Sequence, residues 1–265
     1  MTKRILITGS TDGIGKLAAV QLAQDGHDIY LHGRNPEKLA TVISEVKSQS
    51  KNERVKGLVA DFSNLDEVRK MAQEVNGMMS SLDVLINNAG IFNSAVSHNK
   101  KGLDMRYVVN YLAPYLLTNT LMPLLQKGTS PRVINLSSAA QAPISIDVLK
   151  GMAHRSDRET YAQSKLAITM WSFHLAQQVR DVVVIAVNPG SLLNTKMVKE
   201  AFGKFWSSAD KGANILHDLA VLDQYKEATG QYFDNDQGAF GPAHPAAYNE
   251  EGINILLNAT AALLD

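Results

Sequence analysis

The stretch RILITGSTDGIG, residues 4–15, decides the fold, because a short apolar run there enters a glycine-rich turn and then a helix. Leu17, Val20 and Leu22 continue that helix with apolar periodicity. Glycines at such a turn let backbone N–H groups approach a pyrophosphate at the positive end of the helix. A tight connection that binds nothing is the alternative, but a position directly after the first strand favours a dinucleotide site. The residues of this predicted site are Gly9, Thr11, Asp12, Gly13, Ile14 and Gly15.

Outward from this turn, short β-branched runs alternate with helix-length stretches. Repeated strand-helix-strand order predicts an α/β protein with a doubly wound parallel sheet, the Rossmann fold. No linker or repeat divides the sequence, so residues 1–265 are expected to form a single domain. The predicted strands are Arg4–Thr8, Asp28–His32, Arg54–Val59, Asp83–Asn87, Arg132–Ser137 and Asp181–Val187.

The composition excludes several classes of protein. The 265 residues include 26 Lys and Arg against 26 Asp and Glu, and this zero formal charge predicts no binding to nucleic acid or to a membrane surface. The absence of cysteine excludes disulfides and thiolate chemistry and fits a reducing compartment. The longest apolar run, Val182–Val187, is much shorter than the roughly 18 to 20 residues of a membrane span. We therefore expect a soluble, cytoplasmic protein.

The end of the second strand predicts which dinucleotide is preferred. NAD-selective sites place a carboxylate about 20 residues after the glycine-rich turn, where it binds the ribose 2′-hydroxyl. This strand instead ends LHGR, residues 31–34, with a cation and no carboxylate. Arg34 would pair the 2′-phosphate of NADP, although a solvated arginine is the alternative. NADPH is therefore expected in preference to NADH, and Asp61, followed by Phe62, is expected near the adenine amino group.

Further motifs make a resemblance to a known family specific. They are Gly9-xxx-Gly13-x-Gly15, Asn87-Asn88-Ala89-Gly90, Asn110, Ser138 and Tyr161-Ala162-Gln163-Ser164-Lys165, in that order. With these motifs the whole chain resembles the short-chain dehydrogenase/reductase family. Segments 103–138 and 161–167 are most similar to its retinol-dehydrogenase and WW-domain-oxidoreductase branch. The resemblance implies hydride transfer between a nicotinamide and a carbonyl or alcohol, with Asn88, Ala89 and Gly90 at the cofactor.

Tyr161 and Lys165 lie four residues apart on a predicted helix, so their side chains share one face. A tyrosine titrates near 10 and an acid-base catalyst near the working pH. We therefore expect the Lys165 ammonium to lower the pKa of Tyr161 by stabilising tyrosinate by roughly 4 kcal/mol. The resemblance implies that Lys165 also binds the nicotinamide ribose. Such a pair is common on ordinary helices and gains meaning only from the surrounding motifs.

Ser138 ends the fifth predicted strand, at the carboxyl edge of the sheet where doubly wound folds bind ligands. The resemblance assigns it to the substrate carbonyl, to which a hydroxyl donates as negative charge develops. A serine that only caps the turn is the alternative.

Asn110 lies within a predicted helix over residues 103–126, four residues before Pro114. Since proline has no N–H to donate to the Asn110 carbonyl, a kink is expected that leaves this carbonyl free to hold a water. The resemblance places that water in a proton relay with Lys165. A kink needed only for packing is the alternative.

The sixth predicted strand ends Asn188-Pro189-Gly190, where the family pattern continues with a threonine that binds the nicotinamide carboxamide. Thr195 stands one place late, and we retain Pro189, Gly190 and Thr195 as cofactor-binding residues. Residues 191–210 are expected to form a lid over the substrate. The aromatic and apolar residues of that lid, or alternatively of the core, are Met197, Phe202, Phe205 and Trp206.

Ser138 and Tyr161 are separated by a long interval, residues 139–160, yet both must reach one carbonyl oxygen. The interval is therefore expected to loop outward beside the substrate entrance without lengthening either catalytic element, and to obstruct the helix pairing of tetrameric relatives. A solvated loop without functional contacts is the alternative. Pro143 disfavours helix at its start, and its later part is polar.

Together these motifs predict an NADP(H)-dependent oxidoreductase for a small, apolar carbonyl or alcohol substrate, with Tyr161 as general acid/base. The alternative is a dinucleotide-binding sensor or partner-binding protein without turnover. A hydrolase using Ser138 is disfavoured because no Gly-x-Ser-x-Gly elbow surrounds that serine. The seven histidines show no ligand-like pairing, so no metal is expected, and the oligomer would be a homodimer or homotetramer.

Overall fold

The computed structural model describes residues 1–264, without the side chain of Phe202. It contains an eight-stranded sheet in the order β3-β2-β1-β4-β5-β6-β7-β8, parallel except for β8, which pairs antiparallel with β7. The predicted doubly wound sheet is confirmed, and all six predicted strands are present. The strands are β1 (Arg4–Ile7), β2 (Asp28–Gly33), β3 (Val55–Val59), β4 (Val84–Asn87), β5 (Arg132–Leu136), β6 (Val183–Asn188), β7 (Gln231–Asp234) and β8 (Ala239–Gly241).

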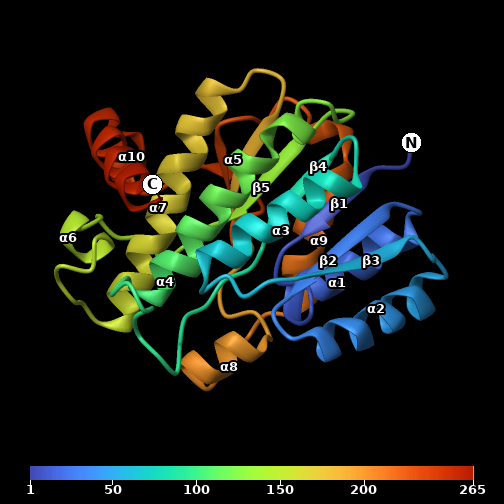
Figure 1. Cartoon of the computed structure of the whole chain (residues 1–265), viewed down its shortest axis with the longest axis horizontal. Helices are drawn as coiled ribbons and strands as arrows, with labels where there is room; N and C mark the ends of the chain where they lie inside the picture. The colour runs from blue at the N-terminus through green and yellow to red at the C-terminus, as the bar shows by residue number, and fades with distance from the viewer. Residues whose placement is uncertain (265) are drawn as a thin grey trace.

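Helices cover both faces of this sheet, as Figure 1 shows. Alternate side chains along β1 enter different cores: Ile5 and Ile7 pack on one face, and Leu6 on the other. The first face is covered by α1 (Gly13–Gln24), α2 (Pro36–Ser50) and α9 (Ala209–Val221). The second face is covered by α3 (Leu65–Met78), α5 (Ala113–Leu125), α7 (Asp157–Gln178) and α10 (Glu250–Leu264). Burial on both faces explains why the central strands are almost entirely apolar.

The predicted helix over residues 103–126 is divided into three parts. These are α4 (Met105–Tyr107), the π-helical segment η1 (Val108–Leu112) and α5. Pro114 stands in the first turn of α5, and Asn110 lies in the middle of η1. The predicted kink therefore takes the form of a π-helical turn, which accommodates a residue that cannot continue the regular hydrogen-bond ladder.

The interval between Ser138 and Tyr161 does not loop outward along its whole length. It contains the short helix α6 (Ile146–Leu149), whose Val148 and Leu149 are buried. Helix α7 begins at Asp157, so the expectation that no catalytic element is lengthened is wrong for the last four residues. A capping box between Ser156 and Glu159 explains this early start, because it satisfies free N–H groups of the first turn.

The C-terminal part of the chain covers the outer side of α7. The short helix η3 (Pro245–Tyr248) and α10 both pack on α7, and Figure 1 shows α10 beside it. Helix α8 (Lys196–Phe202) lies in the predicted lid, and η2 (Asp223–Tyr225) follows α9. Across residues 1–264, no helix is both long and apolar enough to cross a membrane.

Candidate active site

The glycine-rich turn lies between β1 and α1, in direct contact with the loop that follows β4. Gly9 has φ +63°, and a Cβ there would lie 2.7 Å from the Cα of Ala89. A Cβ on Gly15 would lie 2.4 Å from Asn88 Nδ2. That amide donates to the carbonyls of Thr8 and Gly9 at 2.8 and 2.9 Å. The glycines are required by these close approaches, and the turn keeps a backbone surface suited to a pyrophosphate.

Two cations near this turn, Lys38 and Lys16, are already paired. Asp12 caps α1 by accepting from Gly13 N–H at 2.8 Å, and its other oxygen accepts from Lys38 Nζ at 2.8 Å. Lys16 forms an ion pair with Glu45. Arg34 follows β2, is exposed, and has no hydrogen bond or ion pair to any residue that the structure describes. Its guanidinium therefore remains free for an anionic ligand.

Two predicted cofactor residues, Asp61 and Phe62, lie in the loop after β3. Thr11 lies in the glycine-rich turn. Asp61 Oδ1 accepts from Ser63 N–H at 2.9 Å, and Asp61 is only partly buried. The Phe62 ring is buried and stacks on His32. A Cβ on Gly33 would lie 2.4 Å from Thr11 Cγ2, which explains the glycine at the end of β2.

Ser138 and Tyr161 come together despite the long interval between them. Burial raises the pKa of Tyr161, and a hydrogen bond between its hydroxyl and that of Ser138 opposes the shift. The Phe92 ring packs on Tyr161 with centroids 4.8 Å apart. The Ser138 carbonyl accepts from the Tyr232 hydroxyl at 3.0 Å, which ties the catalytic loop to β7.

Lys165 also reaches this site, but with a partner the sequence did not predict. Its Nζ donates to the carbonyl of Leu136 at 2.8 Å and lies 5.6 Å from the centre of the Tyr161 ring. Burial lowers the pKa of Lys165 to about 8. In this arrangement burial raises the pKa of Tyr161. That Lys165 lowers this pKa stays a prediction.

Asn110 holds the loop after β4 in place. Its Oδ1 accepts from Ile91 N–H at 2.8 Å, and its Nδ2 donates to the Ile91 carbonyl and to Ser164 Oγ, both at 3.0 Å. A Cβ on Gly90 would lie 3.3 Å from Asn110 Oδ1 and 3.6 Å from Lys165 Nζ. The side chains of Asn110 and Lys165 therefore meet beside Gly90. Asn110 fixes the backbone of this loop through its two hydrogen bonds to Ile91.

The loop after β6 is fixed by residues that the sequence analysis did not identify. Asn235 Nδ2 donates to the Pro189 carbonyl at 2.8 Å, and Asp236 accepts from Ser191 N–H at 2.8 Å. Both residues lie in the turn between β7 and β8, two strands that were not predicted. The signal that would have found them is the polar run 234–236 between two short aromatic segments, which is typical of a hairpin.

Thr195 lies next to the glycine-rich turn. It caps α8 through a hydrogen bond from Val198 N–H at 3.3 Å, and its Cγ2 would lie 3.6 Å from a Cβ on Gly13. The predicted lid therefore passes beside the glycine-rich turn. In this lid Phe205 and Trp206 are exposed, Met197 is partly buried, and the side chain of Phe202 lies outside the described residues.

Two histidines pair across loops that are distant in sequence. His154 Nδ1 lies 2.9 Å from His98 Nε2, a contact that the sequence did not indicate. Among residues 1–264, no group of three or more His, Cys, Asp or Glu side chains is arranged for a metal ion.

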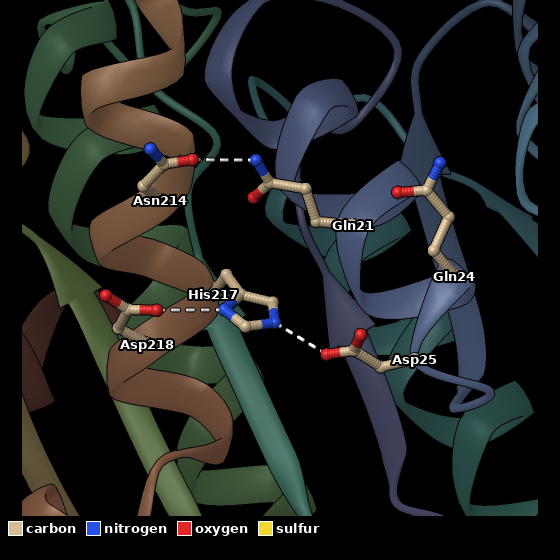
Figure 2. Close-up of a pocket in the computed structure, with 6 residues that line it drawn as sticks. All are labelled: Gln21, Gln24, Asp25, Asn214, His217 and Asp218. Carbon is tan, nitrogen blue, oxygen red and sulfur yellow. Dashed lines mark hydrogen bonds and ion pairs between the residues drawn. The ribbon is translucent and has the colours of Figure 1, made fainter.

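A polar pocket lies elsewhere, between α1 and α9 (Figure 2). His217 bridges Asp218 and Asp25 there at 2.9 and 2.7 Å. None of the predicted site residues lines it. The lining residues are Gln21, Gln24, Asp25, Asn214, His217 and Asp218.

The doubly wound sheet, with a glycine-rich turn and a serine-tyrosine-lysine group at its carboxyl edge, defines a dinucleotide-dependent oxidoreductase of the Rossmann type. Residues 3–204 match the short chain dehydrogenase family. The chain therefore belongs to that family, and it is an NAD(P)-dependent short-chain dehydrogenase/reductase.

Similar proteins include a polyprenol dehydrogenase and retinol dehydrogenases. Human polyprenol dehydrogenase is 31% identical over 253 residues, which cover 88% of this chain and 76% of that protein. Mouse retinol dehydrogenase 13 is 31% identical over 251 residues, covering 88% of this chain and 75% of that protein.

A solved structure of a short chain dehydrogenase from Escherichia coli CFT073, in complex with NADPH, has a similar fold. Its TM-score is 0.73 at 27% identity, covering 89% of this chain and 97% of that one.

Proposed function

We propose that this chain is an NADPH-preferring oxidoreductase that interconverts an apolar ketone or aldehyde and the corresponding alcohol. The observation that carries the proposal is the hydrogen bond between Ser138 and Tyr161, together with the convergence of Lys165 and Asn110 beside Gly90. A protein that only bound a dinucleotide would need the glycine-rich turn but not this group.

The nicotinamide, when bound, would supply or accept the hydride. Ser138 would donate a hydrogen bond to the substrate oxygen as negative charge develops. Tyr161 would give a proton to that oxygen during reduction and take it back during oxidation. Lys165, which burial keeps easy to deprotonate, would hold the nicotinamide ribose and return the proton to Tyr161.

The preference for NADPH rests on Arg34. Its guanidinium is exposed and has no partner among residues 1–264, whereas Lys16 and Lys38 are paired with carboxylates. A free guanidinium suits a phosphate because it donates two parallel hydrogen bonds. The NADPH complex of the Escherichia coli relative supports this choice.

The apolar substrate class rests on the lid and on the relatives. Phe205 and Trp206 expose large apolar surfaces in the segment that starts beside the glycine-rich turn. The relatives named above are called polyprenol and retinol dehydrogenases. A lid of this kind would cover a hydrocarbon substrate and exclude water from the site.

A panel of ketones, aldehydes and secondary alcohols, assayed with NADPH, NADP, NADH and NAD, tests the proposal. We expect turnover with NADPH, and higher kcat/KM for longer apolar carbonyl compounds than for small polar ones. Binding of NADPH without turnover of any compound would favour a sensor that retains the fold. Higher kcat/KM with NADH would contradict the cofactor preference.

A further inference from the structure

His32 is a buried histidine at the end of β2, between two loops of the proposed cofactor site. Its ring stacks on Phe62, with centroids 4.1 Å apart and planes inclined by 25°. On one side lies the glycine-rich turn after β1, and on the other the loop after β3. No sequence motif identified this residue, because a single histidine in a strand resembles an ordinary core side chain.

Both ring nitrogens of His32 have backbone partners. Gly9 N–H donates to Nδ1 at 3.0 Å, and Nε2 lies 2.9 Å from the carbonyl oxygen of Ala60. The backbone of His32 adds two bonds to the same turn: its N–H donates to Ser10 Oγ at 2.9 Å, and its carbonyl accepts from Ser10 N–H at 3.0 Å. His32 therefore connects the glycine-rich turn directly to the end of β3.

These partners allow only one form of the ring. A backbone N–H can only donate, so Nδ1 must be an acceptor; a carbonyl can only accept, so Nε2 must carry the proton. The ring is then neutral and in the Nε2–H tautomer. Burial favours the same state, since it lowers the pKa of His32 to about 4.

The N–H, the carbonyl and the Cα of Gly9 all have close neighbours in this arrangement. Its N–H is held by His32, its carbonyl by Asn88 Nδ2, and its Cα side by Ala89. Without the imidazole, Gly9 N–H would have no acceptor and the turn would have to shift to find one. A shift of this turn would move the N–H groups that face the pyrophosphate.

We propose that His32 is a positioning residue for the adenosine half of the cofactor, holding the glycine-rich turn and the loop at Ala60–Phe62 at a fixed separation. The inference rests on the proposed function, in which these two segments bind the dinucleotide. The nicotinamide half is excluded from this role, because the hydrogen bonds and the ring contact of His32 reach Gly9, Ser10, Ala60 and Phe62, and none reaches Tyr161 or Lys165.

The test compares ligands for the two halves of the cofactor. His32→Phe keeps a ring that can stack on Phe62 and removes both ring hydrogen bonds. We expect it to weaken the binding of adenosine 2′,5′-bisphosphate, measured by calorimetry, by about tenfold. Binding of reduced nicotinamide mononucleotide and kcat at saturating NADPH should change by less than twofold.

His27→Phe is the matched control. His27 is also buried, precedes the same strand β2, and accepts from a backbone N–H, that of Lys3, at 3.2 Å through Nδ1. It lies at the opposite end of β2, so its loss should leave the affinity for adenosine 2′,5′-bisphosphate unchanged. A change of less than threefold in His32→Phe, or an equal loss in both variants, would overturn the role of His32.

Failure of the proposed function is recognised separately, since the wild-type chain would then bind neither NADPH nor the bisphosphate. A second measurement uses the wild-type protein and does not depend on the folding of a variant. The ¹⁵N chemical shifts of the His32 ring at pH 7 should show a single neutral form protonated at Nε2. A ring protonated at Nδ1, or at both nitrogens, would overturn the proposal.

Discussion

The two ends of helix α1 each lie near a histidine, and the two histidines are held in opposite ways. At the N-terminal end, His32 is buried among backbone groups, and burial lowers its pKa to about 4. At the C-terminal end, His217 lies between Asp25 and Asp218 (Figure 2). Burial alone would lower the pKa of His217. The hydrogen bonds and the negative charges of the two carboxylates have the larger effect, so the pKa is raised.

The opposite pKa shifts of His32 and His217 match the different surroundings of the two ends of α1. Near the glycine-rich turn a neutral ring can accept from a backbone N–H and so fix the shape of an anion-binding surface. At the far end His217 joins α9 to α1 through its contact with Asp25, and the protonated form of its ring is favoured at the C-terminal end of a helix. Lys165, at the carboxyl edge of the sheet, is also shifted by burial toward its neutral form, since its pKa falls to about 8.

The largest effect is expected from Tyr161→Phe at the carboxyl edge. Removal of the hydroxyl should lower kcat by about 10³- to 10⁴-fold, because the group proposed to transfer the proton would be lost. The Kd for NADPH, measured by fluorescence titration, should change by less than twofold. Tyr115→Phe, on α5 and against Trp171, is the control and should leave kcat unchanged. Activity of the Tyr161 variant within tenfold of wild type would reject the role of this hydroxyl.

Lys165→Met should separate function from stability at the same edge. Because folding lowers the pKa of Lys165 from 10.5 to about 8, its contribution to stability is largest above pH 10.5 and is lost as the pH falls through 8. At pH 7 the buried ammonium is therefore unfavourable, and the methionine variant should unfold at an equal or higher temperature. Its kcat/KM should fall roughly a hundredfold, and NADPH should bind more weakly. Unchanged cofactor binding, or a marked loss of thermal stability at pH 7, would contradict this account.

The fold could be predicted from the sequence because its signals are local. The glycine-rich turn follows a short apolar run, and runs such as Val182–Val187 identify strands covered on both faces. Strands β7 and β8 were missed, since each is short and only Tyr232 and Phe233 are buried in β7. Pairing within the sheet, and not local pattern, holds them in place: β7 pairs with β6, and β8 pairs with β7.

The candidate site was predictable in its residues but not in all of its contacts. Tyr161, Ser138 and Asn110 stand in recognisable motifs, and the structure brings them together. The roles of His32 and Asn235 depend on partners 23 and 46 residues away, Gly9 and Pro189, and no local pattern encodes such pairs. The partner of Lys165, the Leu136 carbonyl, follows from burial of the lysine, which the sequence does not reveal.

Arg34→Asp should change cofactor choice without affecting the opposite end of α1. A carboxylate would repel the 2′-phosphate and accept from a 2′-hydroxyl, so the ratio of kcat/KM for NADPH to that for NADH should fall by about 10- to 100-fold. Lys56→Asp, the same charge change at an exposed position on β3, is the control and should leave the ratio unchanged. An equal loss with both cofactors would mean that Arg34 has only a structural role.

Met152→Asp tests whether the interval 139–160 borders the substrate entrance. Met152 is 74% exposed, whereas the neighbouring Val148 and Leu149 are buried, so a substitution disturbs the fold less than a deletion would. We expect kcat/KM to fall about fivefold for long apolar substrates, whose contact with the loop would be lost, and to stay constant for small ones. Met78→Asp, at the end of α3, should have no such selectivity. An equal effect on every substrate, or no effect, would place this loop outside the entrance.

His217→Asn addresses the C-terminal end of α1 and should have the smallest effect. Because folding raises the pKa of His217 above 6.5, its stabilising contribution is fully present below pH 6.5 and is lost as the pH rises through the folded-state value. The variant should therefore be less stable than wild type by about 1 kcal/mol at pH 5.5, in denaturant unfolding, and nearly equal to it at pH 9.

His174→Asn, on α7 and without an ion pair among residues 1–264, should show no such pH dependence. The Kd for NADPH should be unchanged, because His217 contacts α1 at Asp25, at the end of that helix remote from the glycine-rich turn. A loss of cofactor affinity in this variant would show that α1 transmits changes from one end to the other, and that the two histidines are not independent.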